Sequence, residues 1–243
     1  MKLAEGLAML ELPTDFMGRK GTINPILAWD ANAAVLVDAG FPGQAPLIKE
    51  RMEKAGVPFD RLTHIIITHQ DLDHIGSLAA LKSMTGDKAR VIAHAEETPY
   101  IQMEKIPVKF TPERIQQMKN DSKNPFFSSM DDFMAKMKTK VDWVVNDEDE
   151  IDLCGGISII HTPGHTPGHI SLYFRKYKLL VTGDAMNLVD GELVGPMPEF
   201  TADLDLATAS LEKYAAYDIQ NIICYHGGYL QENAKEKIQS LVE

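Results

Sequence analysis

The sequence T-H-Q-D-L-D-H occupies residues 68–74 and directly follows an apolar run at residues 62–67. A run of this kind predicts a strand that is buried on both faces, so the polar stretch begins where the strand ends. Two histidines and two aspartates close together are side chains that bind metal ions. The motif alone has a simpler interpretation, an aspartate-rich turn that caps a helix. The rest of the chain must therefore supply further ligands.

Further candidate ligands follow other predicted strands. His165 lies in the turn T-P-G-H-T-P-G-H at residues 162–169, Asp184 lies in T-G-D-A, and His226 lies in H-G-G. Imidazoles and carboxylates on glycine-flanked turns at strand ends suit a metal site carried on rigid elements. Together with residues 68–74, these three turns favour a metal site over a chance grouping of histidines and aspartates.

The local geometry of residues 68–74 favours two metal positions over one. Residues two apart in an extended segment share a face, so His69 and Asp71 can point together. Asp73 and His74 are adjacent and lie where a helix begins, which can turn them toward a second position.

Strand and helix patterns predict how the chain is layered. Strands are predicted at residues 7–12, 25–29, 33–37, 62–67, 90–94, 143–145, 150–153, 158–161, 170–174, 178–182 and 221–225. Helices are predicted at residues 44–55, 75–84, 203–217 and 231–242. Each half has strands followed by a helix, a strand and a helix. This order predicts two packed sheets with helices on their outer faces.

Residues 97–140 differ in character and predict a helical insertion. Thr111 and Pro112 begin one helix that runs through Lys119, and Ser129 resembles the cap of a second. The second helix carries an apolar stripe made of Met130, Phe133, Met134 and Met137. We interpret this stripe as a small core under the insertion. The alternatives are an apolar lid over a site and the interface of a homodimer.

Composition limits the classes of partner. The chain has 243 residues and a formal net charge of -11, with no lysine and arginine cluster of the kind that neutralises phosphates. We therefore expect a small-molecule substrate and neither nucleic acid nor membrane as a partner. The N-terminus lacks the apolar core of a signal peptide, and the two cysteines are far apart, so we expect a cytoplasmic protein.

These motifs resemble those of the metallo-β-lactamase superfold of binuclear hydrolases, over essentially the whole chain. The resemblance implies one domain at residues 1–243 of the α/β class, an αββα sandwich of two mixed sheets with helices on the outer faces. The family motif is written H-x-H-x-D-H, followed in order by His, Asp and His. Carried over to this chain, the motif implies that His69, Asp71 and His165 bind a first metal. It implies that Asp73, His74 and His226 bind a second metal, and that Asp184 bridges the two. Asp38 in V-D-A-G matches an aspartate that supports the site from behind the ligands.

The remaining histidines are predicted to have other roles. His161 and His169 flank the ligand turn and are expected to form hydrogen bonds, His64 is expected to be structural, and His94 is not expected to be a ligand. Strand alternation predicts that Tyr225 points away from the direction of its neighbour His226.

Asp71 departs from the family motif, which has a histidine at this position. Carboxylate is a harder donor than imidazole and shifts metal preference from zinc toward iron or manganese. Members that resemble flavodiiron proteins have a glutamate here and bind iron. We expect two divalent or mixed-valence ions of Zn, Fe or Mn. The alternative is a weak or empty first position, because aspartate is shorter than glutamate.

The resemblance implies a binuclear metal-dependent hydrolase of a small ester, lactone or thioester. A hydroxide that bridges the metals would be the nucleophile, and Asp73 would shuttle the proton to the leaving group. Length and insertion resemble those of quorum-quenching lactonases. One alternative is a flavodiiron-like di-iron oxidoreductase, which the lack of a flavodoxin segment after Val242 disfavours. The other is a catalytically silent metal-binding or regulatory member of the fold.

Overall fold

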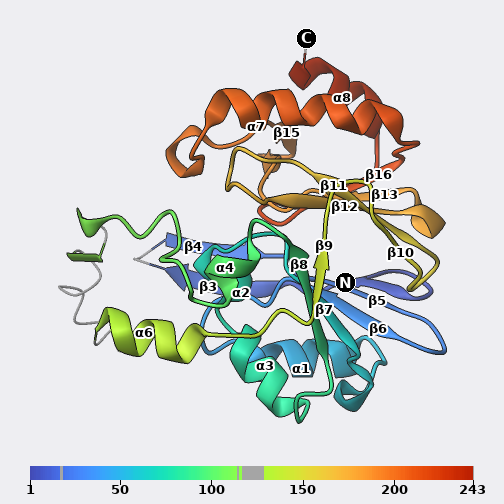
Figure 1. Ribbon diagram of the computed structural model, residues 1–243. Helices are drawn as coiled ribbons and strands as arrows, with labels where there is room; N and C mark the ends of the chain where they lie inside the picture. The colour runs from blue at the N-terminus through green and yellow to red at the C-terminus, as the bar shows by residue number, and fades with distance from the viewer. Residues whose placement is uncertain (17–18, 114, 117–128, 243) are drawn as a thin grey trace.

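The computed structural model describes residues 1–16, 19–113, 115–116 and 129–242, and in them two β-sheets pack face to face (Figure 1). The first sheet contains, in spatial order, β1 (Lys2–Ala4), β2 (Leu7–Met9), β5 (Ile26–Trp29), β6 (Ala34–Val37), β7 (His64–Ile66), β8 (Arg90–His94) and β9 (Trp143–Val145). The second contains β10 (Glu150–Ile151), β11 (Ile157–His161), β12 (Ile170–Phe174), β13 (Leu179–Val181), β16 (Asn221–Cys224) and β17 (Gly228–Leu230). Both sheets are mixed, because β6, β7, β8 and β9 run parallel in the first and β13 pairs parallel with β16 in the second.

Helices cover the outer face of each sheet (Figure 1). The first sheet is covered by α1 (Ala45–Lys54) and α3 (Leu78–Met84). The second is covered by α7 (Leu204–Ser210), the 3-10 helix η4 (Leu211–Ala216) and α8 (Ala234–Val242). The predicted αββα sandwich is therefore confirmed.

Strand alternation assigns each buried side chain to one of the layers. In β6, Leu36 packs toward the helices while Val37 packs between the sheets. In β16, Ile223 packs between the sheets and Ile222 toward the helices on the other side. Successive residues of a strand point to opposite faces, so strands buried on both faces must be apolar throughout. This requirement explains the continuous apolar runs in the sequence.

Several elements differ from the sequence-based expectation. The predicted strand at residues 7–12 is β2 followed by the start of a separate hairpin, β3 (Leu12–Phe16) with β4 (Arg19–Ile23). A second hairpin joins β14 (Asn187–Val189) and β15 (Glu192–Val194). These hairpins lie outside the two large sheets and carry no continuous apolar pattern, which is why the sequence did not indicate them.

Short helices occupy several connections. The helix predicted at residues 75–84 is interrupted, since α2 (Leu72–Ile75) ends before α3 begins. The others are α4 (Thr98–Ile101) and the 3-10 helices η1 (Phe59–Arg61), η2 (Arg175–Tyr177) and η3 (Pro198–Phe200). No helix in the described ranges combines the length and apolar character needed to cross a bilayer.

The insertion packs against the first half of the molecule. Its helix α6 (Met130–Met137) is capped by Ser129, whose side chain accepts a hydrogen bond of 3.1 Å from the Asp132 N–H. Phe133 and Met137 are buried in the same core as α1 and α3. The stripe therefore packs as core, but in the core that α1 and α3 share and not in a separate small core under the insertion. Of the helix predicted at residues 111–119, residues 112–113 and 115–116 are helical, and residues 114 and 117–119 lie outside the described residues.

Gly76, at the end of α2, provides a test of how tightly this helix packs against Pro42. A Cβ there would overlap both Cδ and N of Pro42, although the backbone of Gly76 is helical, with φ −57. We expect Gly76→Ala to lower the free energy of unfolding by about 1–3 kcal/mol, because an added methyl group has no room. Urea denaturation measures the change.

Gly195→Ala is the matched control, because no described atom lies within 4 Å of the Cβ it would gain. We expect it to be neutral or slightly stabilising. Equal stability of the two variants would show that the contact between Gly76 and Pro42 is not tight.

Candidate metal centre

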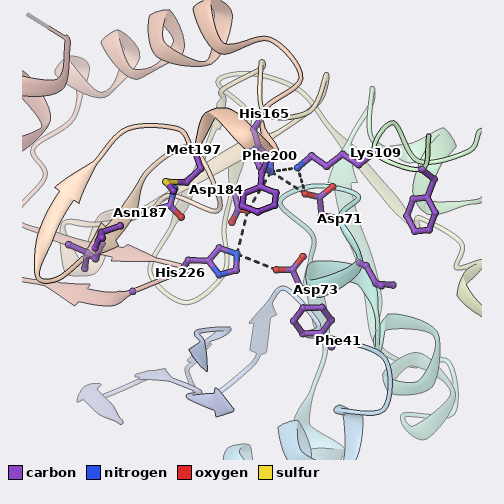
Figure 2. Close-up of a pocket in the computed structure, with 15 residues that line it drawn as sticks. Phe41, Asp71, Asp73, Lys109, His165, Asp184, Asn187, Met197, Phe200 and His226 are labelled. Atoms are coloured by element: carbon purple, nitrogen blue, oxygen red, sulfur yellow. Dashed lines mark hydrogen bonds and ion pairs between the residues drawn. The ribbon is translucent and has the colours of Figure 1, made fainter. Parts of the chain in front are cut away.

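The seven candidate ligands converge from both sheets. His69 and Asp71 lie in the loop after β7, and Asp73 and His74 lie in α2. From the second sheet come His165 in the turn between β11 and β12, Asp184 after β13, and His226 in the turn between β16 and β17. Figure 2 shows five of them, Asp71, Asp73, His165, Asp184 and His226, directed toward one another.

One group contains His69, Asp71, His165 and Asp184, whose potential ligand atoms all lie within 4.8 Å of one another. Asp71 Oδ2 is 3.2 Å from His69 Nε2 and 3.1 Å from His165 Nε2. Asp71 therefore points toward the same space as the two imidazoles, as a ligand of a shared cation would.

The other group contains Asp73, His74 and His226, whose potential ligand atoms meet the same 4.8 Å limit. Asp73 Oδ2 is 3.2 Å from His226 Nε2 and 3.8 Å from His74 Nε2. Asp184 lies between the groups: its Oδ1 is 3.2 Å from His74 Nε2, and its Oδ2 is 3.4 Å from His165 Nε2. One carboxylate thus faces both groups.

Three atoms at the centre form no hydrogen bond of normal geometry among the described residues, namely His69 Nε2, His74 Nε2 and Asp184 Oδ1. His69 Nε2 and His74 Nε2 nevertheless lie 3.2 Å from oxygens of Asp71 and Asp184, respectively. Buried polar atoms are nearly always hydrogen-bonded, and a bound ion is one of the reasons for an exception. All three atoms face the two groups. The donor set of imidazole nitrogens and carboxylate oxygens therefore fits metal ions.

Asp38 and Thr68 orient two of the imidazoles from behind. Asp38 Oδ2 is 2.9 Å from His74 Nδ1, and the Thr68 hydroxyl is 2.9 Å from Asp38 Oδ2 and 3.0 Å from His69 Nδ1. The hydroxyl has one proton, which it donates to the carboxylate, so it accepts from His69 Nδ1–H. Nδ1 of each ring then carries a proton, and this hydrogen bond directs the opposite nitrogen, Nε2, to the centre. Asp38 adopts φ 64, a strained conformation that is held by these contacts.

The electrostatic environment of the centre favours a cation. Burial lowers the pKa of His69 to about 4, so its ring is neutral and its lone pair is free. Burial also opposes the charged form of His226, but Asp184 and Asp73 outweigh it and raise the pKa of His226 to about 10. The same balance raises the pKa of His74, where Asp38 and Asp184 are the main carboxylates. The carboxylates thus favour positive charge at these rings, whether from a proton or from a metal ion.

Glu97 joins the loops that carry the first group, a role that no sequence motif indicated. Its buried carboxylate accepts hydrogen bonds from Gln70 N–H at 2.9 Å, Gln70 Nε2 at 3.0 Å, Thr166 Oγ1 at 2.7 Å and Gly168 N–H at 2.8 Å. Gln70 lies between the candidate ligands His69 and Asp71, and Thr166 follows His165. Burial raises the pKa of Glu97 to about 7, although its hydrogen bonds favour the ionised form.

Lys109 is a second residue that sequence reasoning missed. Its ammonium reaches the first group from the insertion, where it contacts Asp71 Oδ2 and lies 2.7 Å from His165 Nε2 (Figure 2). A single lysine in a segment without regular pattern carried no signal of this contact.

Tyr225, which strand alternation predicts to point away from the direction of His226, nevertheless packs against the site. Its ring lies 3.9 Å from the ring of His74, and its hydroxyl donates a hydrogen bond of 2.5 Å to the Asp73 carbonyl. Tyr225 follows the end of β16, so strand alternation does not fix its direction.

The other histidines form hydrogen bonds or stacks around the centre. His169 Nε2 accepts a 3.0 Å bond from Asp184 N–H, and His161 Nε2 is 3.0 Å from the Pro167 carbonyl. The rings of His94 and His161 stack at 4.0 Å. The expectation that His161 and His169 form hydrogen bonds is therefore confirmed.

A pocket of about 390 Å³ opens beside both groups. Its polar end is formed by Asp71, Asp73, Lys109, His165, Asp184 and His226. Its apolar wall includes Phe41, Leu72, Phe110, Met197 and Phe200. An apolar wall with a few convergent polar groups is typical of a small-molecule site.

Comparisons with known proteins agree with this geometry. A family model described as the Metallo-beta-lactamase superfamily matches residues 18–226. The chain is 28% identical over 213 residues to a Bacillus subtilis (strain 168) protein named "Probable metallo-hydrolase YflN", covering 82% of this chain and 76% of that protein. It is 30% identical over 147 residues to hydroxyacylglutathione hydrolase of Pseudomonas aeruginosa (strain LESB58), covering 60% of this chain and 40% of that protein. A crystal structure of a metallo-beta-lactamase family protein from Thermus thermophilus has the same fold, with a TM-score of 0.72 at 20% identity over 98% of this chain and 79% of that one.

Glu97 offers a test of how the centre is held together. Glu97→Gln replaces one acceptor oxygen by an amide that faces donors, so at least one buried hydrogen bond is lost. We expect the free energy of unfolding to fall by about 1–3 kcal/mol and metal affinity to fall with it, at a pH above the pKa of Glu97. Thermal unfolding and metal titration measure the two effects. Glu96→Gln is the control, because Glu96 is exposed; equal behaviour of both variants would contradict a positioning role for Glu97.

Proposed function

Because the chain belongs to the metallo-β-lactamase superfamily, we propose that it is a metal-dependent hydrolase of a small ester, lactone or thioester. The observation that carries this proposal is the convergence of two ligand groups at the polar end of an apolar pocket. The names of its relatives, a probable metallo-hydrolase and a hydroxyacylglutathione hydrolase, support hydrolysis as the class of reaction.

The proposed metal ligands are His69, Asp71 and His165 in the first position and Asp73, His74 and His226 in the second, with Asp184 facing both. Metal ions held there would activate water as a nucleophile near neutral pH and stabilise the oxyanion that develops on the substrate carbonyl. The Nε2 atoms of His69 and His74 are buried and already oriented toward these positions.

The side chains of the pocket supply the rest of the mechanism. Water adds to the carbonyl carbon of the substrate, the bond from that carbon to the leaving oxygen or sulfur breaks, and one proton must pass to the leaving group. Asp73 lines the pocket and is the proposed carrier of this proton. Phe110 and Phe200 provide an apolar surface for the acyl part of the substrate. The stripe on α6 does not take part, because Phe133 and Met137 are buried in the core.

The reaction class is tested with a panel of aryl esters, lactones and acyl thioesters, assayed with the metal-loaded protein. We expect turnover of at least one class, and we expect Asp73→Asn to reduce kcat by about 100-fold or more at saturating metal, because general acid–base catalysis contributes that much. Asp60→Asn, at an exposed position in η1, is the control and should leave turnover unchanged. Absence of turnover across the panel in every metal form would contradict the proposal and favour a catalytically silent binding protein.

Asp71 leads us to propose iron or manganese in preference to zinc. A carboxylate adds negative charge and hardness to the first position, which favours harder cations. We expect protein purified without added metal to contain iron or manganese, and reconstitution with either to give higher activity than zinc. We expect Asp71→His to shift the preference toward zinc. Full occupancy by zinc together with the highest activity in the zinc form would contradict this assignment.

A further inference from the structure

We infer that Lys109 is an intramolecular cation that competes with a metal ion for the first position, so that the two positions fill in sequence and the first position fills last. This inference rests on the proposed metal ligands and adds a means by which the chain controls their occupancy. It concerns the binding of metal and does not depend on which substrate is hydrolysed.

Lys109 contacts the same atoms that a metal ion would bind. Its Nζ contacts Asp71 Oδ2 and lies 2.7 Å from His165 Nε2 (Figure 2). An ammonium group has donors only, so the nitrogen of His165 must accept and present its lone pair. The same lone pair and the same carboxylate oxygen face the first metal position. Lysine and metal therefore cannot both hold these atoms.

The placement of Lys109 is fixed by the residues on either side of it. The Val108 N–H donates a hydrogen bond of 2.8 Å to Gln70 Oε1, and Gln70 is itself bound to Glu97. On the other side, the ring of Phe110 packs at 4.9 Å from the ring of Phe133. The side chain of Lys109 is only 14% exposed. The insertion thus directs the ammonium into the centre and away from solvent.

The two metal positions differ in whether a lysine or arginine side chain pairs with the proposed ligands. In the ranges that the structure describes, no lysine or arginine forms an ion pair with Asp73, His74 or His226, and their charged partners are one another, Asp38 and Asp184. A metal ion can enter the second position without displacing the side chain of a described lysine or arginine. At the first position it must displace the Lys109 ammonium from a mostly buried carboxylate, and the lost charge-assisted hydrogen bond weakens the net affinity.

The same contact accounts for the aspartate at position 71. A histidine there would be neutral and would leave the ammonium of Lys109 with no carboxylate to pair with in the first group other than Asp184. The negative charge of Asp71 and the positive charge of Lys109 instead neutralise each other in a site where an unpaired charge would be unfavourable.

The test is a titration of the metal-stripped full-length chain with Zn²⁺, followed by calorimetry against a competing chelator and by native mass spectrometry. We expect the wild-type chain to bind one ion tightly and a second at least about ten-fold more weakly. We expect Lys109→Met, which keeps the apolar stem and removes the charge, to tighten the second step by about ten-fold or more and bring the two steps together.

Two further variants separate this effect from a general change in charge or folding. Lys109→Arg keeps a positive charge and should keep the weak second step. Lys105→Met removes the same charge from an exposed lysine of the insertion, whose Nζ lies 5.5 Å from the centroid of the Tyr100 ring, and should behave as the wild type. Thermal unfolding of each variant checks that the chain is folded.

The inference is wrong if the wild-type chain binds both ions with equal affinity, or if Lys109→Met and Lys105→Met have the same effect. Its failure is distinguishable from failure of the proposed function. Stepwise binding without turnover of any substrate would remove only the hydrolase proposal, whereas equal binding with turnover would remove only the role of Lys109.

Discussion

The concentration of carboxylates in the buried centre is the constraint on which the site depends. Asp38, Asp71, Asp73 and Asp184 surround four imidazoles, and none of the four carboxylates is exposed. Burying an ionised carboxylate is unfavourable unless it is paired with positive charge or hydrogen-bond donors. The chain meets this need with the hydroxyl of Thr68, protonated rings and the ammonium of Lys109. The orphaned atoms that remain at the centre are those that a metal ion would bind.

This arrangement exists only because the two sheets are packed together. His69 and Asp71 are carried by the first sheet, while His165 and Asp184 are carried by the second. The apolar layer between the sheets holds these strand ends in register, and Glu97 joins the two ligand loops directly through its hydrogen bonds. The geometry of the centre is thus coupled to the stability of the core, as expected for a site built on rigid elements.

The insertion is packed into the core at one end and carries side chains to the candidate site at the other. Its helix α6 contributes Phe133 and Met137 to the core, which anchors the segment. The same segment brings Phe110 to the pocket wall and Lys109 to the first ligand group. A part of the chain outside the sandwich thus reaches both the pocket and the first ligand group. Asp71, which departs from the usual histidine, is the residue that pairs with Lys109.

The sequence by itself determined the layered fold and the seven candidate ligands. Apolar periodicity fixes which faces are buried, and ligands such as His69 and Asp184 stand in short motifs at strand ends, where local pattern is informative. Only the tertiary structure decided the roles of Glu97, Lys109 and Tyr225, and the two small hairpins. Each of these side chains acts through a contact with residues distant in the chain, such as Lys109 with His165. Periodicity describes only which way a side chain faces from its own element, whereas a contact between distant segments forms when whole layers pack.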